Sequence, residues 1–475
     1  DIKGNFKVKN SKLYINSFEI DVVDANVKLD NSKVYVESEK SFILDKQLES
    51  SISEMIIDTK KQTLIANLGI KRFLIETKSK SKILDLKNQA TTLDINFKDT
   101  TFINLKELGT RIVVQDHATD VKINNIAPFV SKSDILKNAK LLNGSLHLKF
   151  LDNDEIHIDT GNIDHNLPFK LDVLKLSGVL KNDILTMENS LNNIKVYSDS
   201  KETKIDIRGL DILKEKMDLD TEENDKSSSI IFTAIDSNII IDSKKNKKIL
   251  SDKFVYKIDG KNLKFTLNYK NTNINYVSKN KKVNYYMKNI NPEFLNTFFG
   301  KEEFILSGSI DINGKSSKQK GLYEGNLYLK DTNIKDFAAL NQVILLVQNA
   351  SIVANPLFSL PTIYRTIKGD IVFNGYKALD GEIKYVYNHK DEYLNLHDIK
   401  THGSEIDFDG YAKIDIKNKT IDSKLKVIFL KDLTLIASKI PLINTIFLDD
   451  KKRFGTDVKI SGDLEDPESS FFNTN

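Results

Sequence analysis

The sequence predicts a mainly β protein built from antiparallel strands. Apolar and polar residues alternate in short runs, most clearly at residues 5–36 and 230–288, which places the apolar side chains of each strand on one face. Turn-forming residues such as Asp30-Asn31-Ser32 separate these runs at short intervals. Few segments show the spacing of a helix. This combination is typical of an antiparallel meander with one apolar face.

Composition bounds the class of protein. The chain has 475 residues, a formal net charge of +3 and no cysteine. No basic surplus is available to neutralise phosphates, so we expect no nucleic-acid partner. Without cysteine, disulfides, thiolate metal sites and a cysteine nucleophile are excluded. The chain begins at Asp1 with no signal sequence or spanning helix. We therefore expect a fragment or processed form, which an N-terminal anchor could precede.

An internal repeat with an offset of 164 residues indicates related blocks. Asn-Ile-Ala-Pro at 125–128 precedes Gly-Ser-Leu at 144–146, and Asn-Ile-Asn-Pro at 289–292 precedes Gly-Ser-Ile at 308–310. Each copy predicts a strand, a helix started by proline, a glycine turn and a second strand. In the first copy, the helix is expected within residues 126–143.

On this basis we expect three regions. Residues 1–125 form an N-terminal β-sheet region, and residues 126–288 form a first block of one helix plus β strands. Residues 289–475 form a C-terminal block with capping helices. At about 150 residues per domain, the length of the chain agrees with three units.

Two apolar segments depart from the β pattern. Residues 337–364 begin with three- and four-residue apolar spacing that predicts a helix, and residues 431–448 form a second such piece. The helix of the first segment is too short to cross a bilayer, which takes about 20 uninterrupted apolar residues, and Asn341, Gln342, Gln348 and Asn349 interrupt it. We interpret them as elements that plug the core, cover the C-terminal end of a groove or face a membrane there. The capping face of the first consists of Leu340, Val343, Ile344 and Val347.

One-sided strands raise the question of what covers their apolar faces. Removing apolar surface from water contributes roughly 25 cal/mol per Å². Two sheets packed as a sandwich, one sheet closed into a barrel, or a curved sheet open to apolar ligands would all satisfy the pattern. Periodicity does not choose among them, and base rates favour the sandwich.

The sequence shows no catalytic or metal-binding motif. Its seven histidines lack metal-binding spacing, and no GxGxxG, GxxxxGK[ST] or GxSxG motif occurs. The acidic run Asp152, Asp154, Glu155 and Asp159 resembles a calcium loop only superficially, because it lacks the turn glycine. We therefore expect no enzymatic activity, no catalytic residues, no cofactor and no metal.

The C-terminal block, best over residues 308–467, resembles the AsmA-like family of large bacterial envelope proteins, in particular its YhdP and TamB branch. The resemblance rests on the order of four segments. These are GDIVFNGYKALDGEIKYVY from 369, HGSEIDFDGYAKIDIKNKTIDSKLKV from 402, SKIPLINTIF from 438 and VKISGDLEDP from 458. They look like that family's closing pattern of a glycine-led strand pair, an Ile-Pro helix and a final strand.

The resemblance implies a long, curved antiparallel sheet that forms an elongated, taco-shaped hydrophobic groove, with a few short helices capping or plugging it. It implies passive phospholipid transport across the periplasm of a Gram-negative bacterium, contributing to outer-membrane lipid homeostasis. Implied partners are phospholipid acyl chains, a membrane at one or both ends and other envelope proteins. An N-terminal segment outside this chain would supply anchorage in the inner membrane.

Alternating apolar positions in the second half of the chain supply the expected groove lining. These are Leu263, Phe265, Leu267, Ile310, Ile312, Leu327, Leu329, Ile371, Phe373, Ile383, Tyr385, Ile406, Phe408, Leu425 and Val427. Each of them is equally compatible with an ordinary core position. The alternative function is a non-enzymatic envelope scaffold or outer-membrane assembly factor whose β core is filled by its own side chains.

Overall fold

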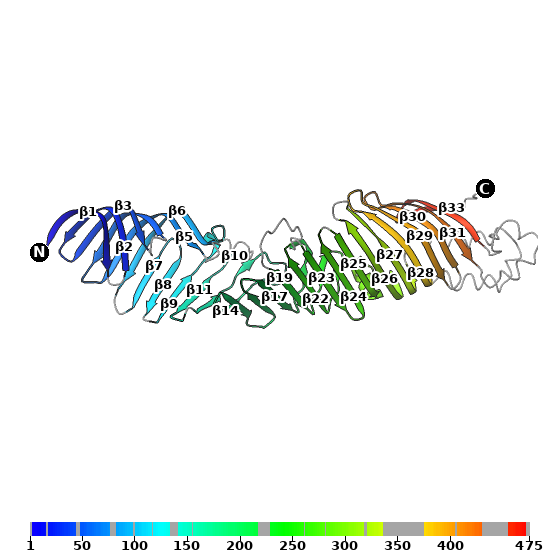
Figure 1. Ribbon diagram of the computed structural model, residues 1–475, viewed down its shortest axis with the longest axis horizontal. Helices are drawn as coiled ribbons and strands as arrows, with labels where there is room; N and C mark the ends of the chain where they lie inside the picture. The colour runs from blue at the N-terminus through cyan, green and yellow to red at the C-terminus, as the bar shows by residue number, and fades with distance from the viewer. Residues whose placement is uncertain are drawn as a thin grey trace, which may run out of the picture. The chain divides into compact units, whose positions relative to one another are not determined.

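The protein is mainly β, as the sequence predicts. The computed structural model describes residues 2–15, 18–43, 48–76, 82–97, 100–115, 117–133, 141–153, 155–216, 229–260, 262–280, 282–317, 321–335, 375–403, 406–429 and 455–471. Within these ranges only two short α-helices occur, α1 (Ala127–Val130) and α3 (Pro292–Phe299). The chain forms two compact units, Asp1–Leu219 and Asp220–Asn475. Figure 1 shows the strands of each unit following one another in chain order.

The first unit is a meander in which successive strands pair antiparallel. Its ladder runs through β1 (Lys3–Ile15), β2 (Phe18–Asp30), β3 (Lys33–Ile43), β4 (Leu48–Asp58), β5 (Thr63–Glu76), β6 (Lys82–Asn96), β7 (Thr101–Leu105), β8 (Thr110–Gln115), β9 (Ala118–Ile123), β11 (Leu146–Leu151), β12 (Ile156–Thr160), β14 (Leu176–Lys181), β15 (Ile184–Asn189), β16 (Ile194–Ser198) and β17 (Glu202–Arg208). Short elements lie beside it: β10 (Leu141–Asn143) with β13 (Asp164–His165), β18 (Ile212–Leu213) and the 3₁₀ turn η1 (Lys214–Lys216).

Strands β2 to β6 of the first unit fill their apolar face with their own side chains. Ile20, Leu64 and Ile95 are fully buried in one cluster, which also contains Phe129 of α1. The turn after α1 is fixed to β6, because the Asp85 N–H donates to the Lys132 carbonyl at 2.9 Å. This part of the sheet therefore has the filled core that the scaffold alternative expects.

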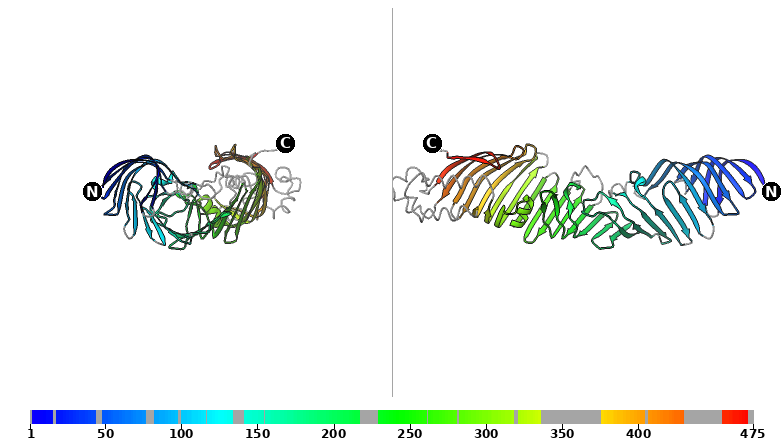
Figure 2. Two further views of the ribbon diagram at one scale, coloured as in Figure 1. Left: turned by 60° about the vertical axis from the view of Figure 1, so that its left-hand side comes forward. Right: turned by 180° about the vertical axis from the view of Figure 1, so that it is seen from behind.

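The second unit is also an antiparallel meander, and its strands are seen from two further sides in Figure 2. Its ladder runs through β19 (Ser229–Ile235), β22 (Lys253–Asp259), β23 (Asn262–Tyr269), β24 (Thr272–Lys279), β25 (Lys282–Ile290), β26 (Ile305–Ser317), β27 (Leu322–Ile334), β28 (Tyr376–Asn388), β29 (Tyr393–Gly403), β30 (Ile406–Asp415), β31 (Thr420–Phe429), β32 (Gly455–Asp463) and β33 (Pro467–Phe471). A small hairpin, β20 (Ile239–Asp242) with β21 (Lys247–Ile249), lies beside it.

The sheets do not close on themselves. Among the described pairings, β1 is bonded only to β2, and β33 only to β32. The sequence left a sandwich, a barrel and an open sheet as alternatives. The structure is the open, mostly antiparallel sheet.

The internal repeat appears as one structural device in both units. A strand leads into a helix that starts near a proline, and the chain then returns beside the same strand, as in β9–α1–β11 and β25–α3–β26. Gly144 and Gly308 mark the return, with φ of 132° and 86°. A side chain at either glycine would meet a backbone oxygen within 2.4 Å. Within the segment 126–143, where a helix is expected, the described residues form α1 and then β10, so the last residues of that segment belong to a strand.

The capping elements and the three-region division stay predictions. Leu340, Val343, Ile344 and Val347, like the segment 431–448, lie outside the described residues, so their capping role stays a prediction. The three expected regions also remain a prediction. The observed boundary near residue 219 falls inside the expected middle block. Among the described residues, no helix is long and apolar enough to cross a membrane.

Candidate functional site

The apolar face of the second unit gathers the predicted lining residues. The strand registers place all of those that the structure describes on this one face; Ile371 and Phe373 lie outside the described residues. In an antiparallel pair, directly opposed residues point to the same side, so the register fixes the facing without further assumption. Their role as a lipid lining stays a prediction.

One line of opposed residues on this face carries no oxygen or nitrogen in its side chains, and we call it the hydrocarbon row. It crosses seven neighbouring strands, β22 to β28. At about 4.8 Å per strand spacing, it extends over roughly 29 Å. The hydrocarbon row consists of Phe254, Leu267, Ile274, Met287, Ile312, Leu327 and Ile383.

The predicted lining residues differ in exposure. Six are buried: Leu267, Ile310, Leu329, Ile406, Phe408 and Val427. Those that keep part of their surface exposed are Leu263, Phe265, Ile312, Leu327, Ile383, Tyr385 and Leu425. A ligand on this face would contact the second group, whereas the first group forms the core beneath it.

Beside the hydrocarbon row runs a second line of opposed residues, which we call the tyrosine row. It consists of Tyr256, Phe265, Tyr276, Tyr285, Gly314, Gly325 and Tyr385. The sequence did not single it out, apart from Phe265 and Tyr385. The available signal was tyrosine, in place of an aliphatic residue, at apolar positions of successive strands.

Two glycines allow the tyrosines of this row to meet. Gly314 and Gly325 lie between Tyr285 and Tyr385, which come from β25 and β28. A Cβ at Gly314 would lie 2.5 Å from the Tyr285 hydroxyl, so that ring occupies the space above the glycine. The two hydroxyl oxygens are 2.7 Å apart and share a hydrogen bond. Tyr323, next to this line, packs its ring 6.3 Å from that of Tyr285.

The low-polarity surroundings alter the acidity of these hydroxyls. Burial raises the pKa of Tyr256, Tyr276 and Tyr285. Burial also raises the pKa of Tyr385, and the hydrogen bond that it shares with Tyr285 adds to the effect. All four hydroxyls therefore remain protonated at neutral pH and able to donate hydrogen bonds.

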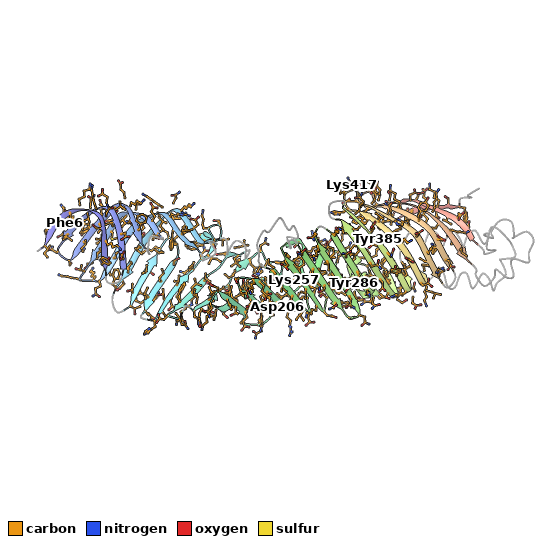
Figure 3. The ribbon with its side chains drawn as sticks, in the orientation of Figure 1. Phe6, Asp206, Lys257, Tyr286, Tyr385 and Lys417 are labelled. Atoms are coloured by element: carbon orange, nitrogen blue, oxygen red, sulfur yellow. The ribbon has the colours of Figure 1, made fainter. Side chains whose placement is uncertain are left out.

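The opposite face of the same strands is polar. One line of neighbours across it consists of Lys257, Lys264, Val277, Asn284 and Lys315, of which only Val277 is apolar. Tyr286 also belongs to this face and is 42% exposed. Lys257, Tyr286 and Tyr385 are labelled in Figure 3. The sheet of the second unit is thus one-sided, as the alternation predicts.

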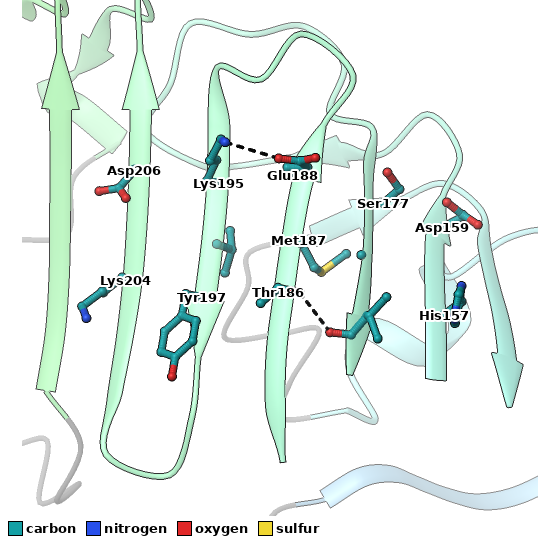
Figure 4. Close-up of a pocket in the computed structure, with 13 residues that line it drawn as sticks. His157, Asp159, Ser177, Thr186, Met187, Glu188, Lys195, Tyr197, Lys204 and Asp206 are labelled. Atoms are coloured by element: carbon teal, nitrogen blue, oxygen red, sulfur yellow. Dashed lines mark hydrogen bonds and ion pairs between the residues drawn. The ribbon is translucent and has the colours of Figure 1, made fainter. Parts of the chain in front are cut away.

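A hollow of about 660 Å³ lies on the polar face of β12 to β17 in the first unit, shown in Figure 4. Sequence reasoning did not identify it. Its side chains mix both signs of charge, with Lys195 3.5 Å from Glu188. The Tyr197 hydroxyl donates to Asp199 at 2.9 Å, which raises the pKa of Tyr197. The lining contains the carboxylates of Asp159, Glu188 and Asp206 and the ammonium groups of Lys195 and Lys204, so neither sign of charge dominates the hollow.

Histidines pair with carboxylates at the surface. His147 lies 2.8 Å from Asp120, and His402 lies 2.8 Å from Asp380. In the calcium-like acidic run, Glu155 accepts hydrogen bonds from His157 at 2.7 Å and from Lys181 at 2.9 Å. Within the described ranges, no three potential ligand side chains gather as a metal site would require.

Comparison with known proteins adds no relative. No protein-family model matches the chain, and no curated protein is similar enough to count as a match. The resemblance to the AsmA-like family therefore stays a prediction.

Proposed function

We propose that this protein carries phospholipid acyl chains along the apolar face of its second unit, in the periplasm between the two membranes of a Gram-negative cell. The observation that carries the proposal is the hydrocarbon row, an unbroken line of apolar side chains across seven strands. Several side chains on this face, such as Leu327 and Ile383, remain partly exposed. Soluble proteins rarely keep large apolar surfaces open unless they bind something there.

Transport in this proposal is passive. Acyl chains slide over side chains of similar polarity, so neighbouring positions along the row differ little in free energy and no deep minimum holds the lipid. The polar opposite face, with Lys257 and Lys264, keeps the sheet in water. The function needs no residue to act on a reacting bond, and outer-membrane lipid homeostasis would be its cellular outcome.

Lipid content is the direct test. The full chain is purified without added lipid, and bound phospholipid is measured by native mass spectrometry and by extraction. We expect phospholipid to copurify with the wild-type protein. In Ile383→Asp, a charge replaces a partly exposed apolar side chain in the hydrocarbon row. We expect bound lipid to fall by about tenfold or more, because hydrocarbon does not compensate an ionised carboxylate.

The matched control places the same charge on the other face. Thr266 follows Phe265 in β23 and points to the opposite side. Thr266→Asp should therefore keep the lipid content of the wild type. Circular dichroism of both variants establishes that the sheet is formed. A lipid-free wild-type protein, or equal lipid in Ile383→Asp and wild type, would contradict the proposal.

The second candidate function is a structural scaffold, and the filled core of β2 to β6 favours it. Ile52 and Met55 in that region are at most 2% exposed, so no ligand reaches them. If the whole protein acts as a scaffold, Ile383→Asp should leave its cellular function intact as long as the sheet is folded.

A further inference from the structure

The two neighbouring rows on the apolar face of the second unit differ in their chemistry. The hydrocarbon row carries no oxygen or nitrogen, whereas the neighbouring tyrosine row contains the hydroxyls of Tyr256, Tyr276, Tyr285 and Tyr385. The tyrosine row lies on the same side of the hydrocarbon row throughout, because the strand registers keep the two rows parallel from β22 to β28. A ligand that is apolar at one end and accepts hydrogen bonds at the other would match both rows at once.

The tyrosine hydroxyls retain capacity to donate. Tyr285 and Tyr385 share one hydrogen bond, in which one hydroxyl is the donor and the other keeps its own proton for a further acceptor. Among the described residues, the Tyr276 hydroxyl makes no hydrogen bond to another protein group. Its pKa is raised by burial, so it stays protonated. A half-buried donor on an apolar face gains most from a neutral acceptor that arrives with hydrocarbon.

We propose that the tyrosine row orients the bound lipid by donating hydrogen bonds to its ester carbonyls, so that the acyl chains lie over the hydrocarbon row. The inference rests on the proposed function and adds its substrate class, a diacyl ester lipid held in one orientation. Ester carbonyls stand between the headgroup and the chains, which matches the adjacency of the two rows. A face with aliphatic side chains alone would not favour one orientation of the lipid over another.

The test compares two lipids that differ only at this group. Full-length protein is freed of lipid with detergent and incubated with vesicles that contain equal amounts of dioleoyl phosphatidylcholine and its dioleyl ether analogue. The ratio bound is read by mass spectrometry. We expect the wild-type protein to favour the ester lipid by about threefold to tenfold, the effect of one or two neutral hydrogen bonds.

Two variants remove hydroxyls and keep the rings. Tyr276→Phe deletes a hydroxyl without an internal partner, so folding is undisturbed, and we expect it to reduce the ester preference. Tyr285→Phe/Tyr385→Phe removes the bridged pair and should reduce the preference further. The matched control, Tyr286→Phe, changes the adjacent tyrosine on the polar face and should leave the ratio unchanged.

The outcomes separate this inference from the proposed function. Equal binding of both lipids by the wild-type protein, or an ester preference that persists in both variants, would overturn the orienting role while leaving acyl-chain binding in place. Failure of the wild-type protein to load either lipid would overturn the proposed function and this inference with it.

Discussion

At the scale of single residues, the glycine pair on the apolar face carries a specific steric demand. Gly325 of β27 is paired directly with Gly314 of the adjacent strand β26. A Cβ at Gly325 would lie 1.9 Å from the carbonyl oxygen of Asn313. Backbone atoms in a paired strand cannot move aside easily. We expect Gly325→Ala to lower the free energy of unfolding by about 1–3 kcal/mol, as for other overpacked sites.

Thermal unfolding followed by circular dichroism measures this effect. Gly381→Ala is the matched control on the same face. Its added methyl would meet the side chains of Thr401 and Leu329 at 3.0 and 3.2 Å, which can adjust. If both variants unfold at the same temperature, the close approach at Gly325 does not limit packing.

The carboxylate of Asp311 stabilises the backbone at Asn289, just before α3 begins. It accepts hydrogen bonds from the Asn289 backbone N–H at 2.7 Å and from Lys330 Nζ at 2.5 Å. Asn289 sits in a bulge with φ of 52°. Burial alone would raise the pKa of Asp311, but these two hydrogen bonds outweigh it and hold the pKa below its ordinary value.

A lowered pKa makes the stabilisation depend on pH in one direction. It is fully present above the ordinary pKa of the group and is lost as the pH falls through the lowered pKa. We expect Asp311→Asn to cost about 1 kcal/mol at pH 7. Below about pH 4 the difference from the wild type should shrink. Melting temperatures from pH 7 down to pH 2 would check this, and a difference independent of pH would contradict it.

At the scale of elements, α3 is defined by its two ends. The Asn291 side chain accepts a hydrogen bond from the Phe294 N–H at 2.9 Å, Pro292 follows it, and Gly300 ends the helix with φ of 66°. Phe294, which is buried, packs its ring 6.3 Å from that of Tyr269. The helix thus attaches an aromatic side chain beside the sheet, as α1 does with Phe129.

Loss of the cap should loosen this attachment. We expect Asn291→Ala to lower stability by about 1 kcal/mol, because one N–H at the start of the helix loses its acceptor. Asn291→Ser keeps an acceptor oxygen and should retain most of the stability. Hydrogen exchange at the Phe294 amide would report the change locally. Equal protection in all three proteins would show that the cap does not hold the helix.

At the scale of the whole molecule, the sequence predicts the fold class and the facing of the strands, because alternation depends only on residues two apart. The predicted lining residues of β23, β26 to β28, β30 and β31 share one face for that reason. The repeat with its two glycine returns is also recoverable, since steric limits on a left-handed turn act on single residues.

Other features depend on contacts that alternation does not encode. The hydroxyls of Tyr285 and Tyr385 meet although they lie 100 residues apart in the chain. The filled core around Leu64 and the partly open face around Ile383 arise from equally one-sided strands, so periodicity could not distinguish them. The hollow near Lys195 results from the local form of a charged sheet face, which its sequence of alternating charges does not specify.

The chain-order pairing of the strands has a consequence for how such a protein changes in length. In β22 to β28 every strand is bonded to its neighbours in the chain, and none needs a distant partner. Inserting one hairpin between two others would lengthen the ladder by about 10 Å and keep the direction of every later strand. It would also add two members to each row on the apolar face. Duplication of a short coding segment is therefore sufficient to lengthen the sheet without changing its existing strand pairs.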